Sequence, residues 1–262
     1  MAMHSKTDVQ LLLAQATASG VLSHGTSSII TGNLGNIVIA GAAGLAMENI
    51  EASDVTLVTL LIDASSSIHD GGLTQSVRDG HAALLDAFAK SREKDSILVA
   101  TWLFHSELQV LHSYVPVSQA MRLTDANYNP CGCTTLYDAW CDGLTANVAY
   151  AERLRTFGTP CRSIAVVMTD GADYGSKRSA KDCACISRDL LKTEQFTLAF
   201  VGVGDQVAFR KVADSMGVPS GNVQVETEAR SSNVRRMFHM VSQSALRVSQ
   251  RTVQPGAGFF SP

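Results

Sequence analysis

Asp63, Ser65 and Ser67 place three oxygen-bearing side chains at every second position of one short segment. One carboxylate and two hydroxyls that face the same way suit a hard cation such as Mg²⁺, which takes oxygen ligands and often keeps several waters, and Mn²⁺ accepts the same ligands. The segment directly follows residues 55–62, an apolar run typical of a strand buried on both faces of a parallel sheet. Because ligands of an open α/β sheet bind beyond the carboxyl ends of its strands, the sequence predicts a metal-binding loop here.

Two further segments bring oxygen ligands to the same predicted edge of the sheet. Thr134 and Thr135 precede a predicted helix over residues 136–155, and Asp170 follows a predicted buried strand over residues 164–168. Taken singly, such residues more often cap helices or form turns. Ligand types from three separate loops, each at a strand end or a helix start, favour a metal site over that structural interpretation.

The elements that must position these loops alternate between strands and helices along the chain. This order predicts an α/β fold with a doubly wound, Rossmann-like and mostly parallel sheet, helices on both faces and one antiparallel edge strand. The expected strands cover residues 55–62, 96–104, 107–111 (the antiparallel edge), 164–168, 196–203 and 223–225. The expected helices cover residues 72–91, 136–155, 178–192, 207–216 and 233–250.

Both ends of the chain differ in composition from this regular part. Residues 1–53 are rich in small residues and are expected to be an N-terminal extension. It would hold a helix over residues 8–18 and a hairpin arm formed by the β-leaning runs 28–31 and 36–39. Residues 251–262 are expected to be a flexible tail, in which the pair Phe259-Phe260 could act as a docking plug.

The three ligand-bearing segments resemble the von Willebrand factor A family over residues 54–250. Members of that family carry a metal-ion-dependent adhesion site built from D-x-S-x-S, a threonine in a G-x-T-x-L-Y-D-A-like segment and an aspartate in a T-D-G segment. The resemblance implies that the divalent cation is Mg²⁺, with Mn²⁺ as a substitute, and that an acidic residue from a protein partner completes its coordination. It assigns the metal to Asp63, Ser65, Ser67, Thr134 and Asp170.

Cys133 marks a departure from the pattern of bacterial relatives, which have Gly-Gly before the threonine where this chain has Gly132 and Cys133. The thiol would lie close to the cation, although sulfur is a poor ligand for Mg²⁺. Thr135 remains an alternative to Thr134 as the third hydroxyl ligand.

The L-Y-D-A and T-D-G segments are similar to those of bacterial stand-alone members, which often work beside AAA+ ATPases of the MoxR type. The resemblance therefore implies a scaffold or adaptor in a bacterial intracellular complex. An alternative is a structural subunit that assembles into a homo-oligomer through its two ends. RNA binding, as in Ro-type proteins that contain a similar domain, is a weaker alternative because the net charge is -3 and nucleic-acid binding needs a basic face.

The sequence does not favour an enzyme. Ser67 lacks the glycines of a G-x-S-x-G nucleophile elbow, and Ser65 stands where a phosphatase of the haloacid dehalogenase type needs a second acid. No P-loop is present, and Gly202-Val203-Gly204 is only part of a dinucleotide fingerprint.

Composition predicts a globular, cytoplasmic protein. Hydrophobic residues make up 45% and charged residues 17%, the N-terminus does not read as a secretory signal, and the apolar stretch 37–47 is too short to span a bilayer. Six cysteines occur, including the pairs Cys131/Cys133 and Cys183/Cys185. C-x-C spacing fits zinc less well than C-x-x-C, so reduced structural thiols are expected, and a redox or metal role stays open.

Overall fold

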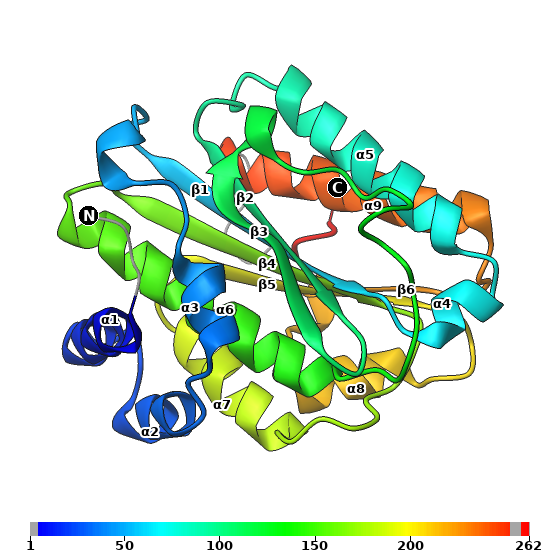
Figure 1. Ribbon diagram of the computed structural model, residues 1–262, viewed down its shortest axis with the longest axis horizontal. Helices are drawn as coiled ribbons and strands as arrows, with labels where there is room; N and C mark the ends of the chain where they lie inside the picture. Colours follow the sequence, from blue (N-terminus) through cyan, green and yellow to red (C-terminus); the bar gives the residue numbers. More distant parts are fainter. Residues whose placement is uncertain (1–4, 252–257, 262) are drawn as a thin grey trace.

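One six-stranded sheet in the order β3-β2-β1-β4-β5-β6 forms the centre of the computed structural model, which describes residues 5–251 and 258–261 (Figure 1). All pairs are parallel except β2 with the edge strand β3, which is antiparallel. The predicted fold class is thereby confirmed. The strands are β1 (Val55–Asp63), β2 (Ile97–Phe104), β3 (Leu108–Pro116), β4 (Cys161–Thr169), β5 (Phe196–Val203) and β6 (Val223–Glu226).

Helices cover both faces of the sheet because successive side chains of β1 are buried on opposite sides. Leu57 and Leu61 belong to one apolar core, whereas Val58, Leu60 and Ile62 belong to the other. One face carries α5 (Thr74–Lys90) and α9 (Ser231–Ser249). The other carries α1 (Lys6–Ala18), α3 (Asn36–Ala42), α6 (Leu136–Thr156), α7 (Ala180–Leu191) and α8 (Phe209–Ser215).

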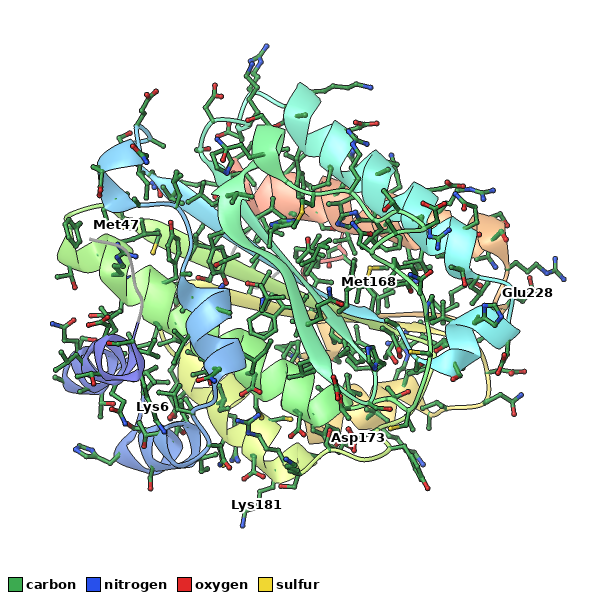
Figure 2. All side chains as sticks on the ribbon, in the orientation of Figure 1. Lys6, Met47, Met168, Asp173, Lys181 and Glu228 are labelled. Atoms are coloured by element: carbon green, nitrogen blue, oxygen red, sulfur yellow. The ribbon has the colours of Figure 1, made fainter. Side chains whose placement is uncertain are left out.

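Side chains fill the space between the sheet and both helical layers (Figure 2). Met168, near the end of β4, lies in this interior and is 6% exposed. Lys6, Lys181 and Glu228 are exposed at the periphery. The centre is therefore a packed core, and the loops at the ends of its strands are where chemistry can occur.

The predicted N-terminal hairpin is wrong, because two helices stand in its place. The predicted helix over residues 8–18 does form as α1, but the two β-leaning runs lie in α2 (His24–Gly32) and α3. The Ser23 hydroxyl caps α2 by accepting from the backbone N–H of Thr26. Burial on the sheet, rather than local β propensity, decides this segment.

Close packing of α3 on the sheet depends on Gly41. A Cβ atom at this position would lie 1.9 Å from the Trp102 ring on β2, so a side chain here would clash with the indole. Val9 and Leu13 of α1 and Val38 of α3 join the same apolar core as Leu57 of β1. The N-terminal helices are thus part of the packed body.

The predicted flexible tail lies partly outside the described residues, which omit 252–257 and 262. Within residues 258–261, Phe259 is buried, and its N–H donates to Asn222 Oδ1 at 2.6 Å. Its carbonyl accepts from Arg247 at 3.3 Å. This piece of the tail therefore packs against α9 and the turn that precedes β6.

Among the described residues, no single helix combines the length and the apolar character of a membrane span. The bent pair His24–Gly32 and Asn36–Asn49 meets that test only when its two halves are taken together.

Candidate metal centre

Asp63 is the last residue of β1, and its carboxylate is held from two sides. It is 1% exposed; its Oδ1 accepts from the backbone N–H of Ser65 at 2.8 Å and its Oδ2 accepts from the Thr169 hydroxyl at 2.5 Å. Thr169 closes the neighbouring strand β4, so the parallel pairing of β1 and β4 brings the two together. The carboxylate is fixed in orientation before any ligand arrives.

The two serines of the predicted motif continue this network toward β4. Ser65 Oγ lies 3.1 Å from Ser67 Oγ, and the Ser67 hydroxyl donates to Asp170 Oδ1 at 2.7 Å. The structure therefore joins Asp63, Ser65, Ser67 and Asp170 in one hydrogen-bonded set, although Ser67 and Asp170 are 103 residues apart in the chain.

Thr134 lies against the loop that carries Asp170. Its carbonyl accepts from the N–H of Tyr174 at 2.7 Å, and a Cβ atom on Gly171 would lie 3.1 Å from its hydroxyl oxygen. Within the described chain, that hydroxyl makes no hydrogen bond, whereas the Thr135 hydroxyl donates to the carbonyl of His105 at 2.5 Å. This geometry favours Thr134 over Thr135 as the available hydroxyl.

The loops that carry these residues are tied together by their backbones. The N–H of Ser66 donates to the carbonyl of Gly132 at 3.0 Å, and the N–H of Cys131 donates to the carbonyl of Ala64 at 2.8 Å. The Tyr128 hydroxyl donates to the carbonyl of Asp63 at 2.6 Å. Residues 63–67 and the loop before α6 therefore form one framework.

Gly132 and Cys133, where the sequence departs from the expected Gly-Gly, face Ser106 at the end of the β2–β3 turn. Gly132 has φ 72°, and a Cβ atom there would lie 2.3 Å from Ser106 Oγ, so glycine is required. The Cys133 thiol lies 3.3 Å from the same Ser106 oxygen. In the described residues, no hydrogen bond joins this thiol to the five predicted ligands.

Burial makes the two carboxylates at this site costly to ionise. It raises the pKa of Asp63 from 3.8 to about 6, an effect that hydrogen bonds from Ser65 and Thr169 oppose and the nearby Asp170 charge reinforces. Burial also raises the pKa of Asp170. In the described part of the chain, neither carboxylate has an ion-pair partner.

The donor set fits a hard divalent cation. All five predicted ligands offer oxygen, and two of them are carboxylates that form no ion pair with a Lys or Arg side chain of the described residues. No group of three or more His, Cys, Asp or Glu side chains suited to a metal occurs in the described residues, so the site depends on hydroxyls. Sequence reasoning missed Thr169 as the residue that orients Asp63, although its place at a strand end was the signal.

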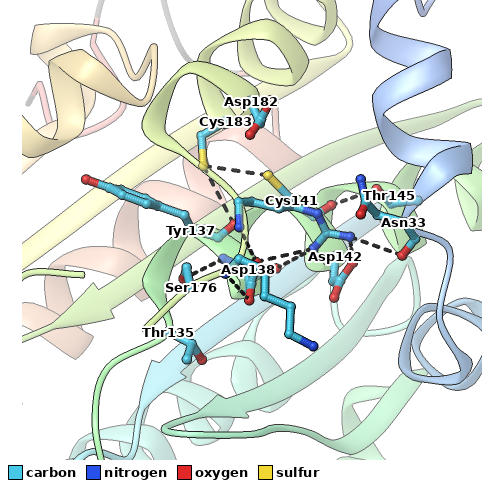
Figure 3. A network of polar contacts seen from close by, with 12 residues as sticks. Asn33, Thr135, Tyr137, Asp138, Cys141, Asp142, Thr145, Ser176, Asp182 and Cys183 are labelled. Atoms are coloured by element: carbon cyan, nitrogen blue, oxygen red, sulfur yellow. Dashed lines mark hydrogen bonds and ion pairs between the residues drawn. The ribbon is translucent and has the colours of Figure 1, made fainter. Parts of the chain in front are cut away.

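A second group of carboxylates lies at the start of α6, beside the loops that carry the five predicted metal ligands, which we call the metal loops (Figure 3). The Arg178 guanidinium lies 2.7 Å from Asp142 Oδ1 and 3.8 Å from Asp138 Oδ1. It also donates to the carbonyl of Asn33 from the N-terminal helices at 3.2 Å. The Asp138 carboxylate accepts from the backbone N–H groups of Lys177 and Arg178, each at 3.0 Å. We call Asp138, Asp142 and Arg178 the arginine cluster.

Comparison of the sequence with protein-family models gives no match, and comparison with curated proteins gives none either. Solved structures do resemble the fold. The pilus adhesin SpaC from Lactobacillus rhamnosus GG in its open conformation is 12% identical, with a TM-score of 0.55, over 76% of this chain and 30% of its own. The PilB minor pilin from Streptococcus sanguinis is 12% identical, with a TM-score of 0.53, over 79% of this chain and 64% of its own.

A von Willebrand factor type A structure from Catenulispora acidiphila is 17% identical, with a TM-score of 0.48, over 74% of this chain and 43% of its own. This chain spans less than two thirds of the length of each of these three proteins. Identities this low bear on the fold alone, and the structures with TM-scores of 0.53 and 0.55 agree with the doubly wound sheet expected from the sequence.

Proposed function

We propose that this chain is a protein–protein interaction module whose binding depends on a divalent metal. The observation that carries the proposal is the pair Asp63 and Asp170, two carboxylates that are hydrogen-bonded into one network and that form no ion pair with a Lys or Arg side chain of the described residues. Uncompensated buried charge is unfavourable, so a bound cation would remove a cost that the folded chain otherwise carries.

Each predicted ligand has a role that its contacts support. Asp63, Ser65, Ser67, Thr134 and Asp170 would hold Mg²⁺ or Mn²⁺, and the bound cation would supply an open coordination position for an acidic side chain of the partner. The Ser65 N–H and the Thr169 hydroxyl orient the Asp63 carboxylate, and Asp170 orients the Ser67 hydroxyl. Gly171 has no side chain to crowd the Thr134 hydroxyl.

The proposed setting is a scaffold or adaptor role in a bacterial intracellular complex, with an AAA+ ATPase of the MoxR type as the candidate partner and no catalytic activity of its own. Self-assembly through the two chain ends has less support. Val9 and Leu13 of α1 and Phe259 of the tail pack within this chain, so these apolar side chains are already covered.

Calorimetric titration of Mg²⁺ and Mn²⁺ into the metal-free chain tests the metal site. We expect one saturable site in the wild type, and an affinity reduced at least 10-fold in Asp63→Ala because a charged ligand is lost. Asp70→Asn is the matched control, since Asp70 is an exposed carboxylate at the end of α4 (Ser66–Asp70) whose side chain makes no hydrogen bond or ion pair within the described chain. Absence of divalent-cation binding in the wild type, or equal binding by Asp63→Ala, would overturn the metal site.

Partner binding is tested by affinity capture with Mg²⁺ and again with EDTA, using the wild type, Asp63→Ala and Asp70→Asn. We expect one set of proteins to be retained only by the wild type and Asp70→Asn, and only with Mg²⁺. A captured set that neither EDTA nor Asp63→Ala changes would refute a metal-dependent interaction, even if the metal itself binds.

A further inference from the structure

Two buried thiols meet where α6 and α7 pack together. Cys141 Sγ of α6 lies 3.6 Å from Cys183 Sγ of α7, and the two side chains are 1% and 0% exposed (Figure 3). The Cys183 thiol also lies 3.6 Å from the carbonyl of Tyr137. The two cysteines are 42 residues apart, so α6 and α7 bring them together rather than any local motif.

This contact between sulfurs has no counterpart at the other cysteines in the described residues. Cys161 is also buried, but its thiol faces the carbonyl of Ala151 at 3.5 Å. Cys185 lies beside Arg188, Cys133 lies beside Ser106, and Cys131 is exposed. The C-x-C spacing therefore does not identify which thiols are in contact, since Cys183 contacts Cys141 and not Cys185.

We propose that Cys141 and Cys183 are a covalent modification site at which a small peroxide forms an intramolecular disulfide. A disulfide has an S–S distance of about 2.05 Å, so the two sulfurs need to approach by roughly 1.5 Å from their present contact. Both helices are already packed at this point through Cys141, Cys183 and Tyr137. The bond would form within the existing arrangement of α6 and α7.

The reaction with hydrogen peroxide balances in two steps. One thiol loses its proton and attacks a peroxide oxygen, which breaks the O–O bond, forms a sulfenic acid and releases one water. The second thiol then loses its proton and attacks the sulfenic sulfur, forming the S–S bond as the sulfenic oxygen leaves as a second water. The two thiols give up two electrons and two protons, which the peroxide receives.

The burial of the two thiols affects the rate of this reaction. Burial, together with the neighbouring Cys141, raises the pKa of the Cys183 thiol well above its usual value. Since the thiolate is the reactive form, oxidation should be slow at neutral pH and faster at higher pH. Burial also favours a small oxidant over a protein disulfide or glutathione.

The position of the pair gives the bond a structural effect. Helix α6 begins directly after Thr134 and Thr135, and α7 follows the loop that contains Asp170. A bond between α6 and α7 would close a chain segment that contains the loop with Asp170 and would restrict the separation of the two helices. The inference stands on the thiol contact alone and does not depend on metal binding.

Peptide mapping of the full-length chain tests the proposal. The reduced protein is treated with hydrogen peroxide in EDTA, alkylated under denaturing conditions and digested, and the peptides joined by a disulfide are measured. We expect a peptide with Cys141 joined to Cys183 in the wild type and in Cys161→Ser, a matched buried thiol. The cross-link should be absent from Cys141→Ser and Cys183→Ser, and it should form faster at pH 9 than at pH 7.

Thermal unfolding gives a second measurement that does not require either serine variant to fold. Oxidised wild type should unfold about 10 °C above the reduced form, as expected for a loop of this size, and a reductant should reverse the shift. The proposal is overturned if peroxide oxidises Cys131 and Cys133 while Cys141 and Cys183 stay reduced. It is also overturned if the cross-link forms only when the chain is unfolded by urea before oxidation.

Discussion

The metal loops and the arginine cluster each hold one buried and one partly buried carboxylate, but the negative charges have different partners in the two groups. In the arginine cluster, Asp138 and Asp142 face the guanidinium of Arg178 and two backbone N–H groups. At the metal loops, Asp63 and Asp170 accept from hydroxyls and backbone N–H groups, and neither forms an ion pair with a Lys or Arg side chain of the described residues. The first group contains its own cation, and the second does not.

This difference is the one expected between a structural site and the proposed binding site. A carboxylate that loses water needs an opposite charge or several hydrogen bonds to stay ionised. Asp142 obtains an opposite charge from Arg178, although burial still raises its pKa. Asp63 obtains hydrogen bonds but no positive charge, and its pKa is raised to about 6. The arginine cluster shows that this chain can place an arginine against carboxylates, so the lack of one at Asp63 is consistent with a cation supplied from solution.

The largest expected effect on stability is that of removing Arg178, the positively charged residue of the arginine cluster. Arg178→Met should lower the free energy of unfolding by about 3–5 kcal/mol at pH 7, because it leaves Asp142 and Asp138 without their buried partner. Urea unfolding measures the change. Arg188→Met is the control on α7; its side chain is exposed, so it should change the value by no more than about 0.5 kcal/mol. A loss below about 1 kcal/mol for Arg178→Met would remove the contrast between the two groups.

A smaller effect of opposite sign is expected at Asp63. Its folded pKa of about 6 lies above the usual 3.8, so the metal-free folded state binds more protons than the unfolded state in this range. The contribution of Asp63 to the free energy of unfolding is fully present below pH 3.8 and is lost as the pH rises through about 6. Asp63→Asn, which cannot ionise, should therefore stabilise the metal-free chain at pH 8 by at most about 3 kcal/mol.

Urea unfolding in EDTA at pH 5 and pH 8 measures this prediction. The gain from Asp63→Asn should be larger at pH 8 than at pH 5, and Asp70→Asn should show no such trend. Saturating Mg²⁺ should raise the stability of the wild type at pH 8 and leave that of Asp63→Asn nearly unchanged. If Asp63→Asn destabilises the metal-free chain at pH 8, then the carboxylate is already compensated within the protein.

The smallest expected effect distinguishes the two neighbouring threonines. Thr134→Ala should weaken Mg²⁺ binding roughly 10-fold with little change in stability, since its hydroxyl makes no hydrogen bond in the described chain. Thr135→Ala should lower the free energy of unfolding by about 1 kcal/mol, because the His105 carbonyl loses its donor, with a smaller change in affinity. Calorimetric titration and urea unfolding of both variants provide the comparison. The reverse pattern would make Thr135 the ligand.

The central sheet and the meeting of the three loops could be predicted from the sequence because their signals are local. Apolar runs mark β1 and β4, and in a parallel sheet the residues at their ends, Asp63 and Asp170, must share an edge. Whether these residues bind a cation stays a prediction. The predicted hairpin is wrong: the runs 28–31 and 36–39 have β-leaning side chains, yet they lie in α2 and α3, and α3 packs closely against Trp102 at Gly41.

The contacts that hold the site together could not be predicted from the spacing of residues in the sequence. Tyr128 reaches the carbonyl of Asp63 across 65 residues, and Arg178 reaches the carbonyl of Asn33 across 145 residues. Cys141 and Cys183 belong to no common motif. Each of these contacts depends on how helices and loops pack after the sheet has formed, and a single sequence carries no local signal for that.

The packing of α1 on α6 has a consequence for the order in which the chain is made. Val9, Leu13 and Ala16 of α1 are 0% exposed in the folded protein, and much of their covering comes from α6. During synthesis, α1 emerges more than a hundred residues before α6, a delay on the order of ten seconds at typical translation rates. Until α6 is synthesised, these three apolar side chains therefore lack much of the covering that they have in the folded protein.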